Sequence, residues 1–358
     1  MLPISVCIIA KNEEQYIGEC LRRLIKYDWE IIVVDTGSTD QTVNIALSYT
    51  PNVFHFEWSD DFSAARNYSI SKAHNDYILA VDCDEYLEDS SLNEKIISAL
   101  PQLISSKQAG MIKRRNPSST YFPDSGESDS DTIYDYAARF FHKKYICFQG
   151  SIHEQLVSKD KDAISFISLP LCFHHVGYSS EKVRSEKAHR NIELLQRALN
   201  LDDSDPYLYF QMGQSYFGIG DYKKAVSYFE KALSMNVDER EDYVQTLVES
   251  YGYSLLYLKK YTTALQLEGI YDIFSKRSDF VFLMGLIYMN NAMFEQAISM
   301  FLHAVTIPNY SVEGVNSYKS FYNTGVIHEC MGNIPEALYY YERCGDYQPA
   351  LHRRSLLK

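Results

Sequence analysis

The stretch Tyr77–Glu85 reads YILAVDCDE and decides the fold of the first half of the chain. Its first five residues are apolar, which is typical of a strand buried on both faces of a sheet, and acidic residues follow where that strand would end. Two further apolar runs, Ile4–Ala10 and Glu30–Val34, also end in polar residues. Because helical patterns separate these runs, the sequence predicts a mainly parallel sheet covered by helices on both faces.

The residues that follow the predicted strands are unusually polar. They read KNEE at 11–14, DTGSTD at 35–40 and DCDE at 82–85. In open sheets of this class, ligands bind beyond the carboxyl ends of the parallel strands. We therefore expect the three clusters to converge on one crevice.

Asp82 and Asp84 stand one residue apart at the predicted end of a strand. On an extended backbone, both carboxylates can reach one hard divalent cation, which would neutralise a diphosphate and make it a better leaving group. A solvated pair of surface acids is the alternative, and the position at a strand end favours a functional site. Asp35 follows the second run, where it can accept a hydrogen bond from a base or a ribose hydroxyl, stabilise a turn, or do both.

The composition excludes several classes of protein. With 358 residues, the chain suits two domains. It carries 34 Lys and Arg against 47 Asp and Glu, a net charge of −13, which is unsuited to binding a nucleic-acid backbone. Seven scattered cysteines without a CxxC pair indicate a reducing compartment. The first apolar run ends at Ala10, too short for a secretory signal or a membrane span, so we expect a cytoplasmic protein, with peripheral membrane association left open.

The chain becomes repetitive from about residue 205. Four glycines that follow apolar residues mark the copies: Gly213, Gly252, Gly285 and Gly325. The pattern resembles tetratricopeptide repeats, which are pairs of helices with a period of about 34 residues. The first and third copies are strong, whereas the second has Glu268 where the later aromatic residue would stand. The prediction is a first domain over residues 1–200, ending in a bridging helix at about 181–200, and an all-α solenoid of about four helical pairs over 201–358.

Residues 116–133 read NPSSTYFPDSGESDSDTI. Four acids fall within eight residues, at 124, 127, 129 and 131. The composition favours a solvated surface loop, and a lid over the crevice is the alternative.

Four motifs together resemble the family 2 glycosyltransferases of the GT-A fold. They are AKNEE at 10–14, VDTGSTDQT at 34–42, DFSAARN at 61–67 and DCDE at 82–85. The later segments FQGSIHE at 148–154 and HVGY at 175–178 narrow the resemblance to a subgroup in which tetratricopeptide repeats follow the catalytic domain. The sublancin-type peptide S-glycosyltransferases are one branch of this subgroup, and bacterial surface-glycan transferases are another.

The resemblance implies an inverting transfer of a hexose or N-acetylhexosamine from a UDP-sugar, with Mn²⁺ or Mg²⁺ as the cofactor. It assigns nucleotide-binding roles to Ala10, Glu13, Asp35, Arg66 and Asp82. The metal would be held by Asp84 and Asp82, with His175 as a further ligand; the neighbouring His174 is the alternative. Glu154 would lie on the acceptor side and act as the general base.

The acceptor implied by the repeats is a polypeptide or a glycan attached to one. The alternative is a transferase for surface polysaccharide or lipid-linked glycan, with the repeats building a homo-oligomer. Two other classes remain: a nucleotidyltransferase and a non-catalytic repeat scaffold. A nucleotidyltransferase would be expected to have a phosphate loop rich in glycine and lysine after the first strand, where this chain has KNEE. A scaffold would not be expected to retain the carboxylates and the arginine of the site together.

Overall fold

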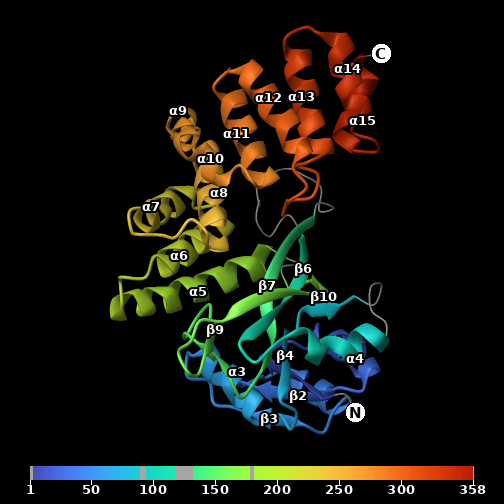
Figure 1. Cartoon of the computed structure of the whole chain (residues 1–358), viewed down its shortest axis with the longest axis vertical. Helices are drawn as coiled ribbons and strands as arrows, with labels where there is room; N and C mark the ends of the chain where they lie inside the picture. The colour runs from blue at the N-terminus through green and yellow to red at the C-terminus, as the bar shows by residue number, and fades with distance from the viewer. Residues whose placement is uncertain (1–2, 89–93, 118–131, 178–180, 358) are drawn as a thin grey trace. The chain divides into compact units, whose positions relative to one another are not determined.

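The computed structural model describes residues 3–88, 94–117, 132–177 and 181–357. The chain divides into two compact units. Unit 1 comprises residues 1–117 and 134–198, and unit 2 comprises residues 118–133 and 199–358. Figure 1 shows the β-strands gathered in the first unit and the stacked helices in the second.

Unit 1 is built on a large mixed sheet. Among the described residues, eight strands follow the order β3-β2-β1-β4-β7-β6-β10-β5. Strands β1 to β4 are parallel to one another, β7 runs antiparallel to β4, and β10 runs parallel to β6. The predicted mainly parallel sheet is therefore confirmed. The strands are β1 (Ile4–Ala10), β2 (Glu30–Asp35), β3 (Val53–His55), β4 (Tyr77–Asp82), β5 (Glu85–Leu87), β6 (Gln108–Pro117), β7 (Thr132–His142) and β10 (Ser165–His175), with β8 (Ile146–Gln149) and β9 (Gln155–Ser158) forming a separate hairpin.

Both faces of the sheet are buried, as the continuous apolar runs predict. In β2, Ile31 and Val33 pack into one core, while Ile32 and Val34 pack into the other. Because successive side chains of a strand point to opposite faces, one run of four apolar residues serves both cores. The helices of this unit are α1 (Ile17–Leu24), α2 (Thr42–Leu47), α3 (Phe62–Ser71), α4 (Glu94–Leu103) and α5 (Glu181–Leu201).

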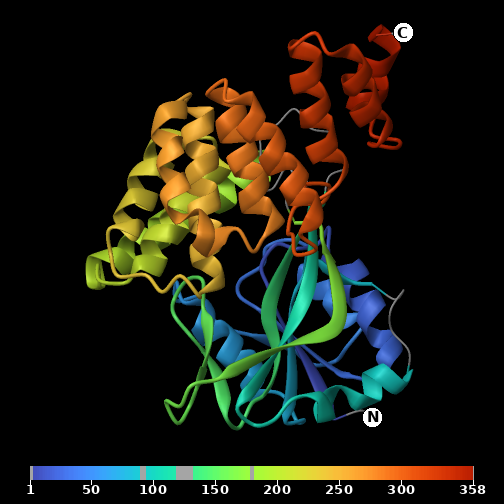
Figure 2. The ribbon, with the colours of Figure 1, turned by 45° about the horizontal axis from the view of Figure 1, so that its top comes forward.

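Unit 2 is helical and confirms the predicted repeats. Its helices are α6 (Pro206–Gly218), α7 (Tyr222–Leu233), α8 (Asp242–Tyr257), α9 (Tyr261–Ala264), α10 (Tyr271–Phe274), α11 (Ser278–Asn290), α12 (Phe294–Thr306), α13 (Tyr318–Cys330), α14 (Ile334–Glu342) and α15 (Gln348–Leu357). Successive long helices stack side by side in Figure 2. In the two strong copies the glycine lets the paired helices approach closely, since a Cβ at Gly213 or Gly285 would lie 2.3 or 2.6 Å from a phenylalanine ring.

The second repeat differs in the way that its sequence suggests. Gly252 faces Leu283 and Leu267 in place of an aromatic ring. The helix that should follow stops after Tyr261–Ala264 and continues as a 3₁₀ segment, Leu265–Ile270, which contains Glu268. Losing the aromatic residue therefore accompanies a broken second helix.

The first residues of β7 belong to the repeat unit. Ile133 is buried in its core and forms a β-bridge with Val312, and the carbonyl oxygen of Thr132 accepts a hydrogen bond from the backbone N–H of Glu313 at 2.9 Å. Of the predicted surface loop or lid, residues 118–131 lie outside the described residues.

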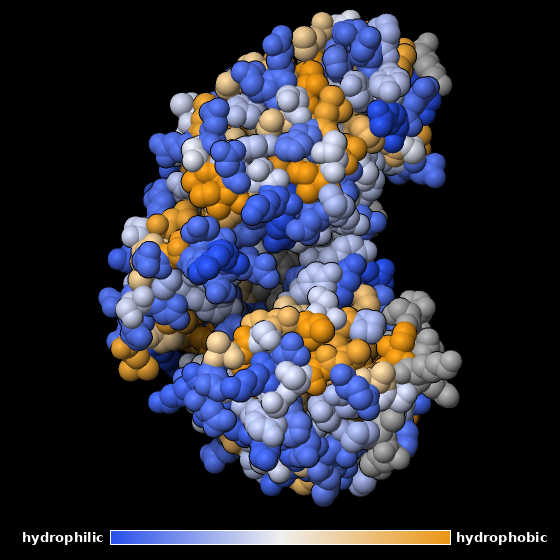
Figure 3. Space-filling model, in the orientation of Figure 1, coloured by the Kyte–Doolittle hydropathy of each residue, from blue (hydrophilic) through white to orange (hydrophobic). Residues whose placement is uncertain are grey.

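Polar side chains cover most of the surface in view, with apolar side chains between them (Figure 3). In unit 2 the exposed large apolar side chains come from several elements: Leu201, Ile273, Tyr310, Met331, Tyr339 and Leu356. Across the described ranges, every helix is too short or too polar to cross a lipid bilayer.

Candidate active site

The polar clusters meet at one edge of the sheet. In the register of the parallel strands, Ala10 pairs with Asp35 and Ile9 pairs with Asp82. The carboxyl ends of β1, β2 and β4 therefore lie side by side, as ligand sites in such sheets require. The first two loops are also tied together, because Asn12 Oδ1 accepts the backbone N–H of Thr39 at 2.8 Å.

Asp35 stabilises the turn that follows β2. Its carboxylate accepts the backbone N–H groups of Gly37 and Ser38, each at 3.1 Å. Gly37 has a φ of +105°, a conformation that favours glycine. The turn role considered from the sequence is therefore present, and the nucleotide-binding role stays a prediction.

Asp82 lies between two arginines. Its Oδ1 accepts a hydrogen bond from Arg66 Nη2 at 2.8 Å, and its Oδ2 accepts one from Arg139 Nη2 at 2.6 Å. Arg66 Nε also donates to Glu154 Oε1 at 2.5 Å. Burial alone would raise the pKa of Asp82, but the charges of Arg139 and Arg66 hold it well below its usual range. We call Glu154, Arg66, Asp82 and Arg139 the arginine side of the site.

The DFSAARN motif explains how Glu154 reaches Arg66. In α3, Asn67 Nδ2 donates to the carbonyl of Phe148 at 2.8 Å, and the backbone N–H of Phe62 donates to the carbonyl of Ser151 at 2.9 Å. These bonds fix α3 against the β8–β9 hairpin, whose connecting loop carries Glu154. The structure thus brings together two predicted site residues that are 88 positions apart.

The ion pairs continue beyond Asp82. Arg139 Nη2 lies 3.5 Å from Glu85 Oε1, and Glu85 is fully buried. The same oxygen accepts Arg114 Nη1 at 3.2 Å, and Arg114 binds both oxygens of Asp135 at 2.8 Å. Sequence reasoning missed Arg114 and Arg139. In the sequence, each is marked only as a charged residue within a strand, and no motif surrounds it to indicate a role in the site.

Asp84 has different partners. Its Oδ2 lies 3.5 Å from His175 Nε2 and 3.0 Å from Lys187 Nζ. The other ring nitrogen of His175, Nδ1, lies 2.9 Å from Asn116 Oδ1. With Nδ1 facing this amide, the ring directs Nε2 at the carboxylate of Asp84. We call Asp84, His175, Asn116 and Lys187 the histidine side.

The geometry distinguishes the two adjacent histidines. Side chains alternate along β10, so His174 and His175 point to opposite faces of the sheet. His174 is the register partner of Tyr86, and burial, together with the charge of Arg115, lowers its pKa. Only His175 contacts Asp84 in the structure, and its role as a ligand stays a prediction.

The pKa values of Asp84 and Glu13 are shifted as well. Burial alone would raise the pKa of Asp84, but the hydrogen bond from His175 and the charges of His175 and Lys187 lower it. Burial and the negative charge of Asp84 raise the pKa of Glu13 to about 7. The pKa of Glu13 therefore depends on the charge of Asp84.

Gly177 leaves room for Asp84. A Cβ at this position would lie 1.7 Å from Asp84 Oδ2. The backbone N–H of Val176 donates to the carbonyl of Asp84 at 2.8 Å. The HVGY segment thus supplies both a histidine and the space in which the carboxylate sits.

The donor atoms of the histidine side suit a divalent cation. A carboxylate oxygen and an imidazole nitrogen, the latter held in place by the Asn116 amide, are ligands that Mn²⁺ accepts. Within the described ranges, no group of three or more His, Cys, Asp and Glu side chains could hold a metal ion. The pair would therefore share the cation with oxygens from a substrate or water. Asp82, bound by two arginines, is less suited to be a ligand.

Comparisons with known proteins agree with this architecture. Residues 5–103 match Glycosyl transferase family 2, and residues 206–237 and 278–309 match the tetratricopeptide repeat. Along the chain, a match to the family 2 glycosyltransferase model is thus followed by two matches to the tetratricopeptide repeat. The two matched repeats are the two strong copies seen in the sequence.

Three curated relatives illustrate the similarity. A TPR repeat-containing protein of Synechococcus elongatus is 28% identical over 67% of this chain and 58% of its own length. The SPbeta prophage-derived glycosyltransferase SunS of Bacillus subtilis is 28% identical over 69% of this chain and 57% of its own. The lipopolysaccharide core biosynthesis glycosyltransferase LpsC of Rhizobium meliloti is 34% identical over 29% of this chain and 37% of its own. The match thus spans less than two thirds of each relative.

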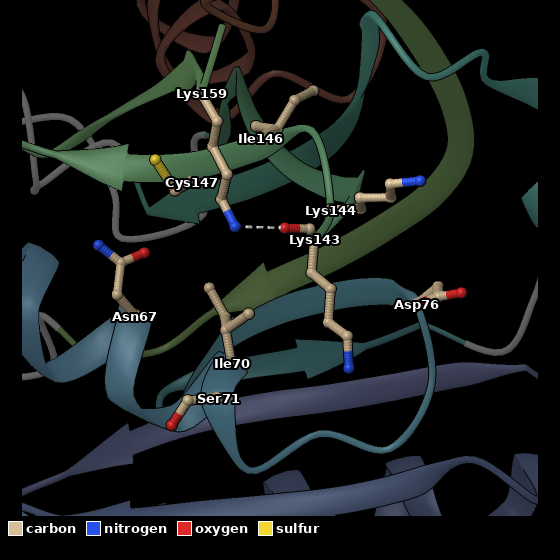
Figure 4. Close-up of a pocket in the computed structure, with 9 residues that line it drawn as sticks. All are labelled: Asn67, Ile70, Ser71, Asp76, Lys143, Lys144, Ile146, Cys147 and Lys159. Atoms are coloured by element: carbon tan, nitrogen blue, oxygen red, sulfur yellow. Dashed lines mark hydrogen bonds between the residues drawn. The ribbon is translucent and has the colours of Figure 1, made fainter.

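The family 2 domain also has a pocket away from this edge. It has a volume of about 560 Å³ and is lined by nine residues of α3, β8 and nearby turns (Figure 4). It includes Asp76, which precedes β4, whereas Asp82 ends that strand. Two of its lysines already donate to backbone carbonyls: Lys143 Nζ to Ala73 and Lys159 Nζ to Lys143, each at 2.7 Å. The pocket therefore lies at the opposite end of β4 from Asp82.

Proposed function

We propose that this chain is an inverting glycosyltransferase that moves a hexose or N-acetylhexosamine from a UDP-sugar to a polypeptide or a protein-linked glycan. The observation that carries the proposal is the contact of Asp84 with His175 at the carboxyl edge of a family 2 domain. In a chain with a net charge of −13, binding a diphosphate needs a local source of positive charge. A divalent cation at this pair, with the arginines next to it, supplies that charge.

The nucleotide is assigned to the loops after β1 and β2. Ala10, Glu13 and Asp35 would contact the uracil and the ribose, as the family resemblance implies. Asp82 ends β4, the strand next to β1, and Arg66 of α3 pairs with it; we assign both to the diphosphate. Asp82 acts here through its two arginines, since its ion pairs hold both guanidinium groups at this edge of the sheet. Its predicted role in nucleotide binding is thereby favoured over a role as a metal ligand.

The metal is assigned to Asp84 and His175, with Mn²⁺ or Mg²⁺ as candidates. When bound, the cation neutralises the charge of the diphosphate and makes UDP a better leaving group. Asn116 keeps the imidazole in place, and Gly177 keeps space beside the carboxylate.

Glu154 is assigned as the general base. An inverting transfer needs a carboxylate on the acceptor side that takes a proton as the new bond forms. Arg66 Nε donates a hydrogen bond to Glu154 Oε1, so a guanidinium group lies against the proposed base. The same ion pair holds the Glu154 carboxylate beside Arg66, the arginine assigned to the diphosphate. The Arg66 side chain therefore connects the proposed base with the leaving-group side.

The repeats support an acceptor that is a polypeptide or is attached to one. Solenoids of this kind present extended surfaces to peptides and proteins, and the exposed apolar side chains of unit 2 are distributed over several of its helices. The similarity to LpsC favours the second candidate, a transferase for surface or lipid-linked glycan whose repeats form a homo-oligomer.

One experiment tests the core of the proposal. The full chain is incubated with a panel of UDP-sugars, with and without Mn²⁺ or Mg²⁺, and released UDP is measured. We expect metal-dependent UDP release with one or a few donors, and mass spectrometry of candidate acceptors then identifies the product. Release of pyrophosphate would indicate a nucleotidyltransferase. No turnover with any donor, in the presence of cell-extract acceptors, would favour a non-catalytic scaffold.

A further inference from the structure

Lys187 contacts the carboxylate oxygen that a cation would need. Its Nζ lies 3.0 Å from Asp84 Oδ2 and 3.2 Å from the carbonyl oxygen of Gly177. The same Asp84 oxygen faces His175 Nε2 at 3.5 Å. The Lys187 side chain is 25% exposed, so water screens its charge only in part. An ammonium group thus sits against the carboxylate from α5, a helix that carries none of the family motifs.

Lys187 is one of several cations that α5 brings to this unit. Arg190 lies one turn further along, stacks 5.5 Å from the Phe62 ring, and its charge acts on Glu13. Arg197, two turns beyond, pairs with Asp60 at 2.6 Å. Unlike these two residues, Lys187 pairs with Asp84, a carboxylate that the proposed reaction requires as a metal ligand.

An ammonium and a divalent cation cannot use the same Asp84 oxygen at once. Both need its lone pairs, and their positive charges repel each other at contact distance. Lysine suits an exchange of partners, because its charge is a compact group on a flexible four-carbon stem. A diphosphate held beside the cation would offer the displaced ammonium new oxygens at the same edge of the sheet.

We propose that Lys187 is an internal counter-ion that competes with the divalent cation for Asp84 and binds the donor diphosphate once the cation has displaced it. The inference rests on the proposed metal and nucleotide sites. Its consequence is that the protein binds the metal weakly alone and tightly together with UDP. Since the coupling is reciprocal, the metal also strengthens UDP binding through the same lysine. Lys187 is therefore a positioning residue that links two ligands.

A purely structural role predicts a different result. If Lys187 only attaches α5 to the rest of the unit, removing its charge would lower stability without improving metal binding. Competition predicts that the neutral variant binds the metal better. Metal affinity in the absence of nucleotide therefore separates the two explanations.

The test uses the full chain and the variant Lys187→Gln, which removes the charge but keeps an N–H donor for the Gly177 carbonyl. Calorimetry measures Mn²⁺ binding alone, and then UDP binding at saturating Mn²⁺. We expect Mn²⁺ alone to bind about 5–10-fold more tightly to the variant, and UDP with Mn²⁺ to bind about 5–10-fold more weakly. Lys187→Arg retains the charge and should stay within about threefold of the parent in both measurements.

Lys107→Met is the matched control. Lys107 also pairs with an aspartate, Asp162 at 2.6 Å, but it is next to the start of β10, whereas His175 ends that strand. The control should bind Mn²⁺ and UDP as the parent does. If Lys187→Gln does not fold, as judged by its thermal transition, Lys187→Met replaces it.

The outcomes separate this inference from the proposed function. Equal or weaker Mn²⁺ binding by the neutral variant, in a protein that binds Mn²⁺ and UDP, overturns the competition and leaves the metal site standing. If neither protein binds Mn²⁺, alone or with UDP, the metal site itself is wrong and the competition is wrong with it. Tighter Mn²⁺ binding with weaker UDP binding supports both.

Discussion

Asp82 and Asp84 of the DCDE segment are separated by a single residue and have unlike surroundings. On the arginine side, Asp82 uses both carboxylate oxygens to bind Arg66 and Arg139, and these arginines are bound in turn by Glu154 and Glu85. On the histidine side, Asp84 faces an imidazole and a flexible ammonium. The first arrangement is a network of guanidinium–carboxylate pairs, and the second has partners that a cation can replace.

This difference suggests a division of labour within one short motif. Removing one partner of a buried ion pair is costly because it leaves the other charge uncompensated, so the arginine side should resist rearrangement. The histidine side combines a metal-binding donor pair with a lysine that can move. We therefore expect the arginine side to keep its groups in one orientation, and the histidine side to exchange partners when the metal binds.

The largest expected effect follows the loss of the Asp84 charge. Asp84→Asn should abolish metal-dependent UDP binding and reduce transfer by about 10³-fold or more, because it removes the charged ligand that faces the diphosphate. Calorimetry with UDP and Mn²⁺ measures the first effect and UDP release measures the second. Asp82→Asn is the matched control and should still bind Mn²⁺ alone. Parental UDP–Mn²⁺ binding by the Asp84 variant would show that the metal is held elsewhere.

Glu154→Gln should reduce transfer to a hydroxyl acceptor by about 10²–10⁴-fold, because the amide keeps the shape but cannot take a proton. UDP and Mn²⁺ affinities should change little, since these ligands are bound by other residues. Comparing initial rates with binding constants separates the two effects. A near-parental rate would mean that another carboxylate is the base, and the acids of residues 124–131 would be tested next.

His175→Ala and His174→Ala form a matched pair on one strand. We expect the first to weaken Mn²⁺ binding by about 10-fold or more, and the second to leave it within about threefold. The reason is that only His175 directs a ring nitrogen at Asp84. Titration with Mn²⁺ followed by electron paramagnetic resonance gives both affinities. The opposite ranking would mean that the register of β10 changes when the metal binds.

Arg139→Met should lower the free energy of unfolding of unit 1 by about 2–4 kcal/mol, because Asp82 and the buried Glu85 each lose a partner. Both tryptophans, Trp29 and Trp58, lie in unit 1, so their fluorescence during urea unfolding reports on this unit. The pKa of Asp82 is lowered, so the pairing contributes fully above pH 4 and is lost only in stronger acid.

The control for that variant is an exposed pair. Arg197→Met removes an ion pair in which both side chains are more than half exposed, and should cost less than about 1 kcal/mol. Equal losses in the two variants would contradict a special role for the buried network.

The smallest expected effect concerns Glu13 and pH. Its pKa is raised to about 7 in the folded chain from 4.5, so folding is favoured while it is protonated and this contribution is lost as pH rises toward and above 7. Glu13→Gln should therefore match the parent near pH 4, below the unfolded pKa, and exceed its stability by about 1 kcal/mol at pH 8. Urea midpoints from tryptophan fluorescence at both values test this. A difference in stability between variant and parent that does not change with pH would contradict the raised pKa of Glu13.

Much of the architecture could be predicted from local pattern. The run YILAV must be buried on both faces, since it is apolar at every position, and this places Asp82 and Asp84 at a strand end. The glycines of the repeats predict close helix pairs, because only a residue without a Cβ lets Phe229 or Phe301 pack there. Glu268 in place of the aromatic residue marked the second repeat as degenerate, whereas the break in its second helix was found only in the structure.

The partners of each carboxylate were decided only by tertiary structure. Arg139 is 57 residues from Asp82 and Lys187 is 103 from Asp84, and neither belongs to a motif that spacing could reveal. The choice between His174 and His175 depends on which face of the sheet each residue meets, and a shift of one residue in register would reverse it. A sequence determines which groups can be ionised near a strand end, whereas the packing of distant strands and helices determines which opposite charge each one meets.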